Sequence, residues 1–223
     1  MSCCTRHDIT FVVNQLSIYA NDPRQAHWDV AIDCLKYVNH TKNWGIVLGT
    51  GNHLQKLMFS ADHGKKGHTS VTDLDAVAYA DANHGTGIDD KKSVSGMVQH
   101  VMGGPVSWNS KVQPTASTST CESEIRALSD ASRESLWIAK LLKLFGLKDR
   151  PFLVRGDNFG AIQSIKKYTT TKYTKQIDIH HEFMKDRYMN GDLDFEYIAG
   201  DNNPADIFTK ALGWNKFEQF GYG

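Results

Sequence analysis

The sequence predicts an α/β fold, a five-stranded mixed sheet with helices packed on it, preceded by a small helical segment. Three observations support this prediction: three strand-like runs follow one another between residues 74 and 111, helical and strand-like runs alternate after them, and two runs of helical periodicity precede them. This order of elements is typical of helices layered on a sheet. With 223 residues, 40% of them hydrophobic, the chain is long enough to bury a core.

Composition sets limits on the function. The formal net charge at pH 7 is zero, so no overall positive field indicates a nucleic-acid partner. Positive charge does exceed negative charge between Lys140 and Arg187, which is equally typical of a solvated helical face and of a phosphate-binding surface. No apolar stretch is long enough to span a membrane and no signal peptide precedes the first helix, so we expect an intracellular protein. The four cysteines form no Cys-x-x-Cys pair, which indicates reduced thiols.

The first 70 residues are predicted to form a separate helical unit. Apolar residues recur at helical spacing in two runs, and two short strand-like runs follow: helices at 9–20 and 27–38, strands at 44–48 and 54–59. A stretch rich in glycine and lysine at 60–71 resembles a linker. We therefore predict a helical pair with a short hairpin at 1–70 and the α/β domain at 71–223.

The first strand of the α/β domain carries the first candidate acid. Residues 74–80 are apolar apart from Asp75, and turn-forming residues follow at 83–87, so a buried strand is predicted to end at Asp81. Ligands bind at the carboxyl ends of strands in open α/β sheets. An Asx turn explains an isolated aspartate at this place more simply. Asp81 therefore becomes a functional candidate only if other acids join it.

A long helix is predicted to supply the second acid. Strands at 93–102 and 105–111, joined at Gly103-Gly104, precede a capping box in which Ser119 caps the helix and Glu122 is the third helical residue. Glu122 and Glu124 lie about 200° apart around the helix axis, so they cannot share one task. Glu124 neighbours the apolar stripe and is expected to be half buried, where a carboxylate needs a partner or a metal.

The remaining elements supply two more acids. They are a strand at 152–156, helices at 158–168 and 177–189, a strand at 193–198 and a last helix from 202 to 211. Asp157 follows its strand as Asp81 follows the first, and Asp206 lies in the first turn of the last helix, where the helix dipole alone would stabilise it. His180-His181-Glu182 lacks the second histidine of a zinc-protease motif and is expected on the helix surface.

Four carboxylates gathered in one place need a counter-charge. Two carboxylates about 5 Å apart repel by roughly 3 kcal/mol at an effective dielectric constant of about 20. The six pairs among four acids therefore cost more than the net stability of a typical domain, about 5 to 15 kcal/mol. Only bound metal or protonation makes such a cluster tenable. For oxygen ligands and a phosphate substrate, Mg²⁺ is the first choice and Mn²⁺ the substitute.

Five motifs in order carry a resemblance to a known family: Ala80-Asp81-Ala82-Asn83, residues 90–96, residues 104–115, residues 119–124, and Ala205-Asp206-Ile207-Phe208-Thr209-Lys210. Residues 71–212 resemble the ribonuclease H domain of copia-type retrotransposon polyproteins, and residues 5–48 resemble the tail of the preceding reverse transcriptase. The resemblance implies a ribonuclease H-like fold and hydrolysis of the RNA strand of an RNA–DNA hybrid. It also implies two divalent metal ions held by Asp81, Glu124, Asp157 and Asp206.

The resemblance assigns roles to these residues. Asp81 would bridge both ions, Asp206 would hold the ion on the side of the attacking water, and Glu124 with Asp157 would hold the ion on the leaving-group side. Substrate contacts to the backbone and 2′-hydroxyl groups would come from Asn83, Ser93, Ser95 and Asn158, although each also suits an ordinary turn or cap.

The chain also departs from the family. The loop at 199–204 lacks the histidine that some ribonucleases H carry before the last aspartate, and Asn83-His84 stands where many relatives have Asp-Trp. No Tyr-x-Asp-Asp occurs, so a polymerase domain would be a partner outside this chain. One alternative is a catalytically inactive nucleic-acid-binding remnant of a domesticated or truncated element. A strand-transferring integrase suits the order Asp-Glu-Asp-Asp less well.

Overall fold

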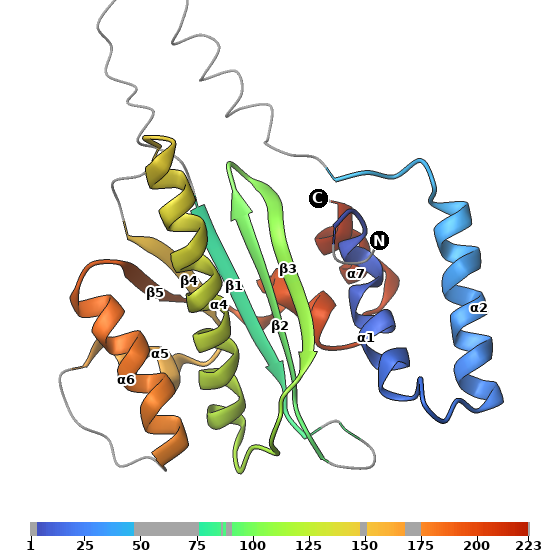
Figure 1. The fold of residues 1–223 in the computed structure, drawn as a ribbon, viewed down its shortest axis with the longest axis horizontal. Coiled ribbons are helices and arrows are strands. Elements are labelled where there is room, and N and C mark those ends of the chain that lie inside the picture. Colours follow the sequence, from blue (N-terminus) through green and yellow to red (C-terminus); the bar gives the residue numbers. More distant parts are fainter. Residues whose placement is uncertain are drawn as a thin grey trace, which may run out of the picture.

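The computed structural model describes residues 4–46, 76–85, 87, 91–147, 151–167 and 175–222. Its centre is a mixed sheet with the strand order β3-β2-β1-β4-β5 (Figure 1). The strands are β1 (Ala76–Asn83), β2 (Val94–Val101), β3 (Gly104–Val112), β4 (Phe152–Gly156) and β5 (Leu193–Tyr197). The first three are antiparallel neighbours, and β4 and β5 run parallel to β1. The predicted α/β class is confirmed, and this strand order is that of the ribonuclease H-like fold.

Small residues let a long helix lie close to the centre of the sheet. Helix α4 (Thr120–Leu144) crosses one face, with α5 (Phe159–Lys166) and α6 (Lys175–Met189) beside it (Figure 1). Ala78 and Ala80 of β1 are fully buried in the same core as Ile125 and Leu128 of α4. Alanine side chains hold the helix at short range from β1, which brings the first turn of α4 level with the end of that strand.

The opposite face of the sheet carries a second, smaller core. The 3-10 helix η3 (Pro204–Phe208) and α7 (Trp214–Tyr222) contribute Ile207, Phe208 and Phe217 to it, packed with Tyr79 and Val98 of the sheet. Successive side chains of a strand point to opposite faces. Asp81, two residues after Tyr79, therefore points towards η3, whereas the alanines of β1 point towards α4.

Polar contacts join the helices before the sheet to one another and, through α1, to β3. They are η1 (His7–Ile9), α1 (Thr10–Ile18) and α2 (Gln25–His40). Arg6 forms a buried ion pair with Asp8, 2.8 Å from Nη2 to Oδ2, and the hydroxyl of Tyr37 donates to the same carboxylate. Asn14 of α1 donates to Ser110 of β3 over 3.1 Å. The predicted helical pair is confirmed, with α2 longer at both ends than expected.

The predictions for residues 44–71 and for His181 have different outcomes. Residues 44–46 have no regular secondary structure, and the rest of the predicted short strands, the linker and the boundary at residue 70 lie outside the described residues. His181 is not on the helix surface as predicted. It is 3% exposed, and its Nε2 lies 3.1 Å from the Ser164 hydroxyl of α5.

The last helix was predicted wrongly. The segment after Asn203 forms only the five-residue 3-10 helix η3, and a separate helix α7 follows that was not predicted. η3 stays short because it lies against β2 at Gly96, and because Thr209 turns its hydroxyl to Asp81. Trp214, Phe217 and Phe220, spaced three residues apart, were the sequence signal for α7.

Candidate metal centre

Three of the four predicted acids meet at one point. Asp81 of β1, Glu124 of α4 and Asp157 after β4 each offer a carboxylate oxygen, and these atoms all lie within 4.8 Å of one another. Asp81 is 3% exposed and Glu124 is 7% exposed. Acids so close and so well removed from water repel strongly unless a cation or a proton joins them.

Asp81 reaches this point from within its strand and not from the strand's end as predicted. β1 continues to Asn83 because β2 pairs with it through Ala82 and Asn83. On its other side, β1 pairs with β4 only as far as Tyr79. Beyond that pair the β4 side of β1 is open, and Asp81 and Asp157 share the opening.

Glu124 has the most strongly raised pKa of the three acids. It accepts a hydrogen bond from the backbone of Ala82, but its buried Oε2 has no hydrogen-bond partner within the described residues. Burial, together with the negative charges of Asp81 and Asp157, raises the pKa of Glu124 to about 9. Without a cation this carboxyl group is protonated at neutral pH.

The pKa values of the two aspartates are also raised. Burial raises the pKa of Asp81 to about 6, and the charges of Asp206 and Asp157 add to the effect, while the hydrogen bond from Thr209 and the charge of Lys210 oppose it. Burial and the charge of Asp206 also raise the pKa of Asp157 above its usual range. The raised pKa of all three acids shows that the positive charges near them do not offset the cost of ionising them.

These residues fit a divalent cation. An unpartnered buried carboxylate oxygen is costly, and Glu124, whose Oε2 has no hydrogen-bond partner within the described residues, belongs to the group that contains two further carboxylates. The donors are oxygen atoms from aspartate and glutamate, which suit hard cations such as Mg²⁺ and Mn²⁺. The prediction that the acids converge on a place suited to metal agrees with this geometry for Asp81, Glu124 and Asp157.

Asp206 lies beside this group with other partners. It is 1% exposed, and its charge raises the pKa of both Asp81 and Asp157, so it is near them. Lys210 Nζ lies 2.9 Å from its Oδ1, and Lys216 Nζ lies 3.0 Å from its Oδ2. The fourth acid thus has an ammonium group near each oxygen, where the prediction had placed a metal ion, although its buried Oδ1 accepts no hydrogen bond within the described residues.

Polar side chains hold η3 against β1. The buried Asn203 donates to the Ala80 carbonyl over 2.9 Å and accepts from the backbone of Ala205 over 3.1 Å. Asn83 donates to the Thr209 carbonyl over 3.2 Å, and the Thr209 hydroxyl donates to Asp81. These bonds fix the position of Asp206 relative to Asp81.

Gly96 of β2 also holds η3 in place, because the absence of a side chain at this position lets η3 pack directly against the strand. A Cβ atom would lie 2.6 Å from Thr209 Cγ2, 2.8 Å from Phe208 Cβ and 2.9 Å from the Ala205 carbonyl oxygen. We expect Gly96→Ala to lower the free energy of unfolding by about 1 to 3 kcal/mol and to weaken Mn²⁺ binding, as urea titration and equilibrium dialysis would measure.

Gly45→Ala is the matched control for Gly96→Ala. A Cβ at Gly45 meets no atom within 4 Å among the described residues. This variant is expected to change stability by less than about 0.5 kcal/mol. If Gly96→Ala were as stable as Gly45→Ala and bound Mn²⁺ normally, the close contact of η3 with β2 would not be what positions Asp206.

The four predicted substrate contacts each have a partner inside the protein. Ser93 is fully buried and accepts from the backbone of Gly85 over 3.1 Å, and Ser95 accepts from the amide of Gln113 over 2.8 Å. Asn158 caps α5 by accepting from the backbone of Ala161 over 2.9 Å. With Asn83 bonded to Thr209, all four are held by hydrogen bonds within the protein, and their contact with substrate remains a prediction.

Sequence reasoning missed the cations of the site. Lys210 lies within the motif that contains Asp206, four residues further on, so its place in a short helical turn was a usable signal. Lys216 lies on a helix that was not predicted, and nothing in the local sequence connects it with Asp206. The roles of Asn203 and Thr209 likewise depend on the packing of η3 against β1.

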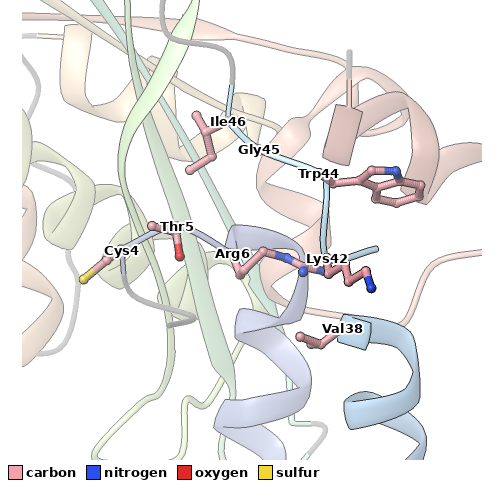
Figure 2. A pocket seen from close by; sticks show the side chains of 8 residues that line it. All are labelled: Cys4, Thr5, Arg6, Val38, Lys42, Trp44, Gly45 and Ile46. Carbon is pink, nitrogen blue, oxygen red and sulfur yellow. The ribbon is translucent and has the colours of Figure 1, made fainter. Parts of the chain in front are cut away.

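A separate hollow lies in the first part of the chain. It has a volume of about 470 Å³ and lies between the segment before η1 and the end of α2 (Figure 2). Its lining residues are Cys4, Thr5, Arg6, Val38, Lys42, Trp44, Gly45 and Ile46. None of these is acidic, and the Arg6 guanidinium is paired with Asp8. This hollow is therefore unsuited to a cation.

Comparisons with known proteins find relatives among retrotransposon polyproteins. No family model matches the chain. It is 28% identical over 215 residues to the retrovirus-related Pol polyprotein from transposon TNT 1-94 of Nicotiana tabacum, a match that covers 96% of this chain and 15% of the relative. It is 30% identical over 217 residues to the corresponding polyprotein from transposon RE1 of Arabidopsis thaliana, covering 97% of this chain and 13% of the relative. The chain thus spans less than a sixth of these relatives' length.

Among solved structures, the chain is similar to LC11-RNase H1 in complex with an RNA/DNA hybrid. The identity is 18%, and the match covers 60% of this chain and 93% of that chain with a TM-score of 0.46. The fold assignment follows from the strand order and not from this likeness. Within the described part of the chain, no helix combines the length and the hydrophobicity needed to cross a lipid bilayer.

Proposed function

Because this chain is homologous over nearly its whole length to the Pol polyproteins of copia-type retrotransposons and carries a ribonuclease H-like domain, we propose that it hydrolyses the RNA strand of RNA–DNA hybrids in a reaction that depends on Mg²⁺. The observation that carries the proposal is the group formed by the buried Asp81 and Glu124 and the partly buried Asp157, in which one oxygen of Glu124 has no hydrogen-bond partner within the described residues. The motifs that resemble the ribonuclease H domain of such polyproteins suggest the substrate class, and the chemistry of the acids supports the reaction type.

The residues of the chain have distinct parts in the proposed reaction. Asp81, Glu124 and Asp157 would hold two divalent ions, and Asp206 would join them from η3. When bound, such ions lower the pKa of an attacking water and stabilise charge on the departing 3′ oxygen. Thr209 orients Asp81 through its hydroxyl group. Asn203 keeps η3, and with it Asp206, at a fixed distance from β1.

The proposed substrate needs no base recognition. The polar groups near the acids belong to turns and strand ends, which suits contacts to sugar and phosphate groups common to all sequences. A hybrid differs from duplex DNA by the 2′-hydroxyl groups of one strand. The reverse transcriptase polymerase that would make such a hybrid is a proposed partner outside this chain.

The proposal is tested with an RNA–DNA hybrid that carries a label on its RNA strand. We expect cleavage of the RNA strand in MgCl₂ and none in EDTA, while duplex DNA of the same sequence stays intact. Absence of cleavage in both Mg²⁺ and Mn²⁺ would contradict the proposal. Hybrid binding that weakens with salt but leads to no cleavage would instead identify the inactive remnant.

A further inference from the structure

Lys216, which belongs to the separate helix α7, forms an ion pair with Asp206, one of the four acids. Its Nζ donates to Asp206 Oδ2 over 3.0 Å and also to Asp201 Oδ1 over 3.3 Å. Asp206 is 1% exposed at its side chain, whereas the side chain of Asp201 is 99% exposed. One ammonium group is thus shared between a buried acid of the site and a solvated acid beside it.

From this arrangement we infer that Lys216 is a displaceable counter-ion that blocks Asp206 until a divalent cation binds. Lys216 donates to Oδ2, and Lys210 Nζ lies 2.9 Å from Oδ1 without donating a hydrogen bond to it, so a metal ion that takes both oxygens of Asp206 must displace Lys216 from Oδ2. When a divalent cation takes one of these oxygens, Lys216 remains paired with Asp201. The lysine therefore lowers the affinity of the site for metal without leaving its own charge unpaired.

Lys216 is better placed for this role than Lys210. Lys210 follows Asp206 by four residues, and its Nζ also lies 4.0 Å from Asp81 Oδ2, so it stays near the acids whichever oxygen a metal takes. Lys216 belongs to α7, which is fixed elsewhere: Phe217 packs into the core with η3 and contacts the ring of Tyr37 in α2. Its helix holds Lys216 at the edge of the site, between two acceptors.

The inference rests on the proposed function, because it concerns the same metal site. Its test is therefore Mn²⁺ binding to the full chain in the absence of nucleic acid, measured by equilibrium dialysis. The variants are Lys216→Met, which keeps length and removes charge, Lys216→Arg, which keeps the charge, and Asp201→Asn. Asp81→Asn serves as the variant that should not bind.

We expect Lys216→Met to bind Mn²⁺ about tenfold more tightly than the parent chain, since one charge-assisted hydrogen bond no longer competes. Lys216→Arg should bind like the parent. Asp201→Asn should weaken binding by about twofold in the parent but have no effect in the Lys216→Met background, as a double-mutant cycle would show.

The possible failures are distinct. If the parent binds Mn²⁺ and Lys216→Met binds equally or less tightly, the counter-ion inference is overturned while the proposed function stands. If neither the parent nor Lys216→Met binds Mn²⁺, both are overturned. Binding by Lys216→Met but not by the parent would support the inference in its strongest form. Circular dichroism of each variant confirms that it is folded.

Discussion

Asp81→Asn is expected to lower the rate of hybrid cleavage by about 10³-fold or more and, at the same time, to stabilise the metal-free protein. The loss of rate follows from the loss of a charged oxygen within 4.8 Å of carboxylate oxygens of Glu124 and Asp157. The gain in stability follows from burial: the pKa of Asp81 is raised to about 6, so above that pH a buried carboxylate is ionised without a full counter-charge. Asparagine removes this charge and still accepts the hydrogen bond from Thr209.

Two measurements check this prediction together. Cleavage of a labelled hybrid in Mg²⁺ gives the rate. Thermal unfolding in EDTA at pH 8 gives the stability, and Tm is expected to increase by about 2 to 4 °C for each kcal/mol gained in the free energy of unfolding. A variant that loses activity because it misfolds would show a lower Tm. The opposite changes in rate and Tm therefore separate a lost ligand from a damaged fold.

Asp130→Asn is the matched control for Asp81→Asn. Asp130 lies on α4, with its side chain 43% exposed, and pairs with Arg133 over 3.2 Å. Because exposed ion pairs contribute little, this variant should change neither the cleavage rate nor the Tm appreciably. Hybrid cleavage by Asp81→Asn at the rate of Asp130→Asn would exclude Asp81 from the reaction.

The parts of the site that could be predicted are those set by local sequence. The apolar run before Asp81, the capping box before Glu124 and the strand before Asp157 each have a local pattern, and the sheet confirms their order. Ser119 caps α4 as predicted, accepting from the backbone of Glu122 over 3.2 Å. Glu122 also proves separate from Glu124, since its carboxylate pairs with Arg126 and bonds to Thr118.

The parts that could not be predicted depend on contacts distant in sequence. β1 extends past Asp81 because β2 supplies hydrogen-bond partners there, which overrides the weak strand preference of Asp81 and Asn83. The segment at Asp206 is a 3-10 helix because it packs directly on Gly96. The ammonium groups on Asp206 come from Lys210 and Lys216, and the second of these depends on how α7 packs.

Raising the pH is expected to destabilise the metal-free protein, mainly through Glu124. In the folded chain the pKa of Glu124 is raised to about 9 by burial and by its acidic neighbours, so the folded state holds a proton that the unfolded chain releases near pH 4.5. The stability associated with this proton is complete below about pH 4.5 and is lost as the pH rises to about 9. The loss is on the order of 3 to 6 kcal/mol, or about 10 °C in Tm.

Mg²⁺ should reverse this loss, because it binds the deprotonated carboxylates of the folded protein and not the unfolded chain. The increase in Tm caused by 10 mM MgCl₂, a concentration on the order of those used to saturate weak Mg²⁺ sites, is therefore expected to grow between pH 6 and pH 9. Thermal unfolding in EDTA and in MgCl₂ across this range measures it. A Tm in EDTA that stays constant or rises with pH would contradict the raised pKa of Glu124.

Two substitutions in the first turns of α4 assign the effect to one residue. Glu124→Gln imitates the protonated side chain at every pH, so the Tm in EDTA should fall less between pH 6 and pH 9, and Mg²⁺ should stabilise this variant less. Glu122→Gln is the control on the same helix. Burial acts to raise the pKa of Glu122, but hydrogen bonds from Thr118 and the charge of Arg126 outweigh it and lower that pKa, so Glu122 is ionised throughout this range. Its replacement should lower the Tm by a similar amount at each pH and leave the slope unchanged, because only a group that exchanges a proton within the range can alter the slope.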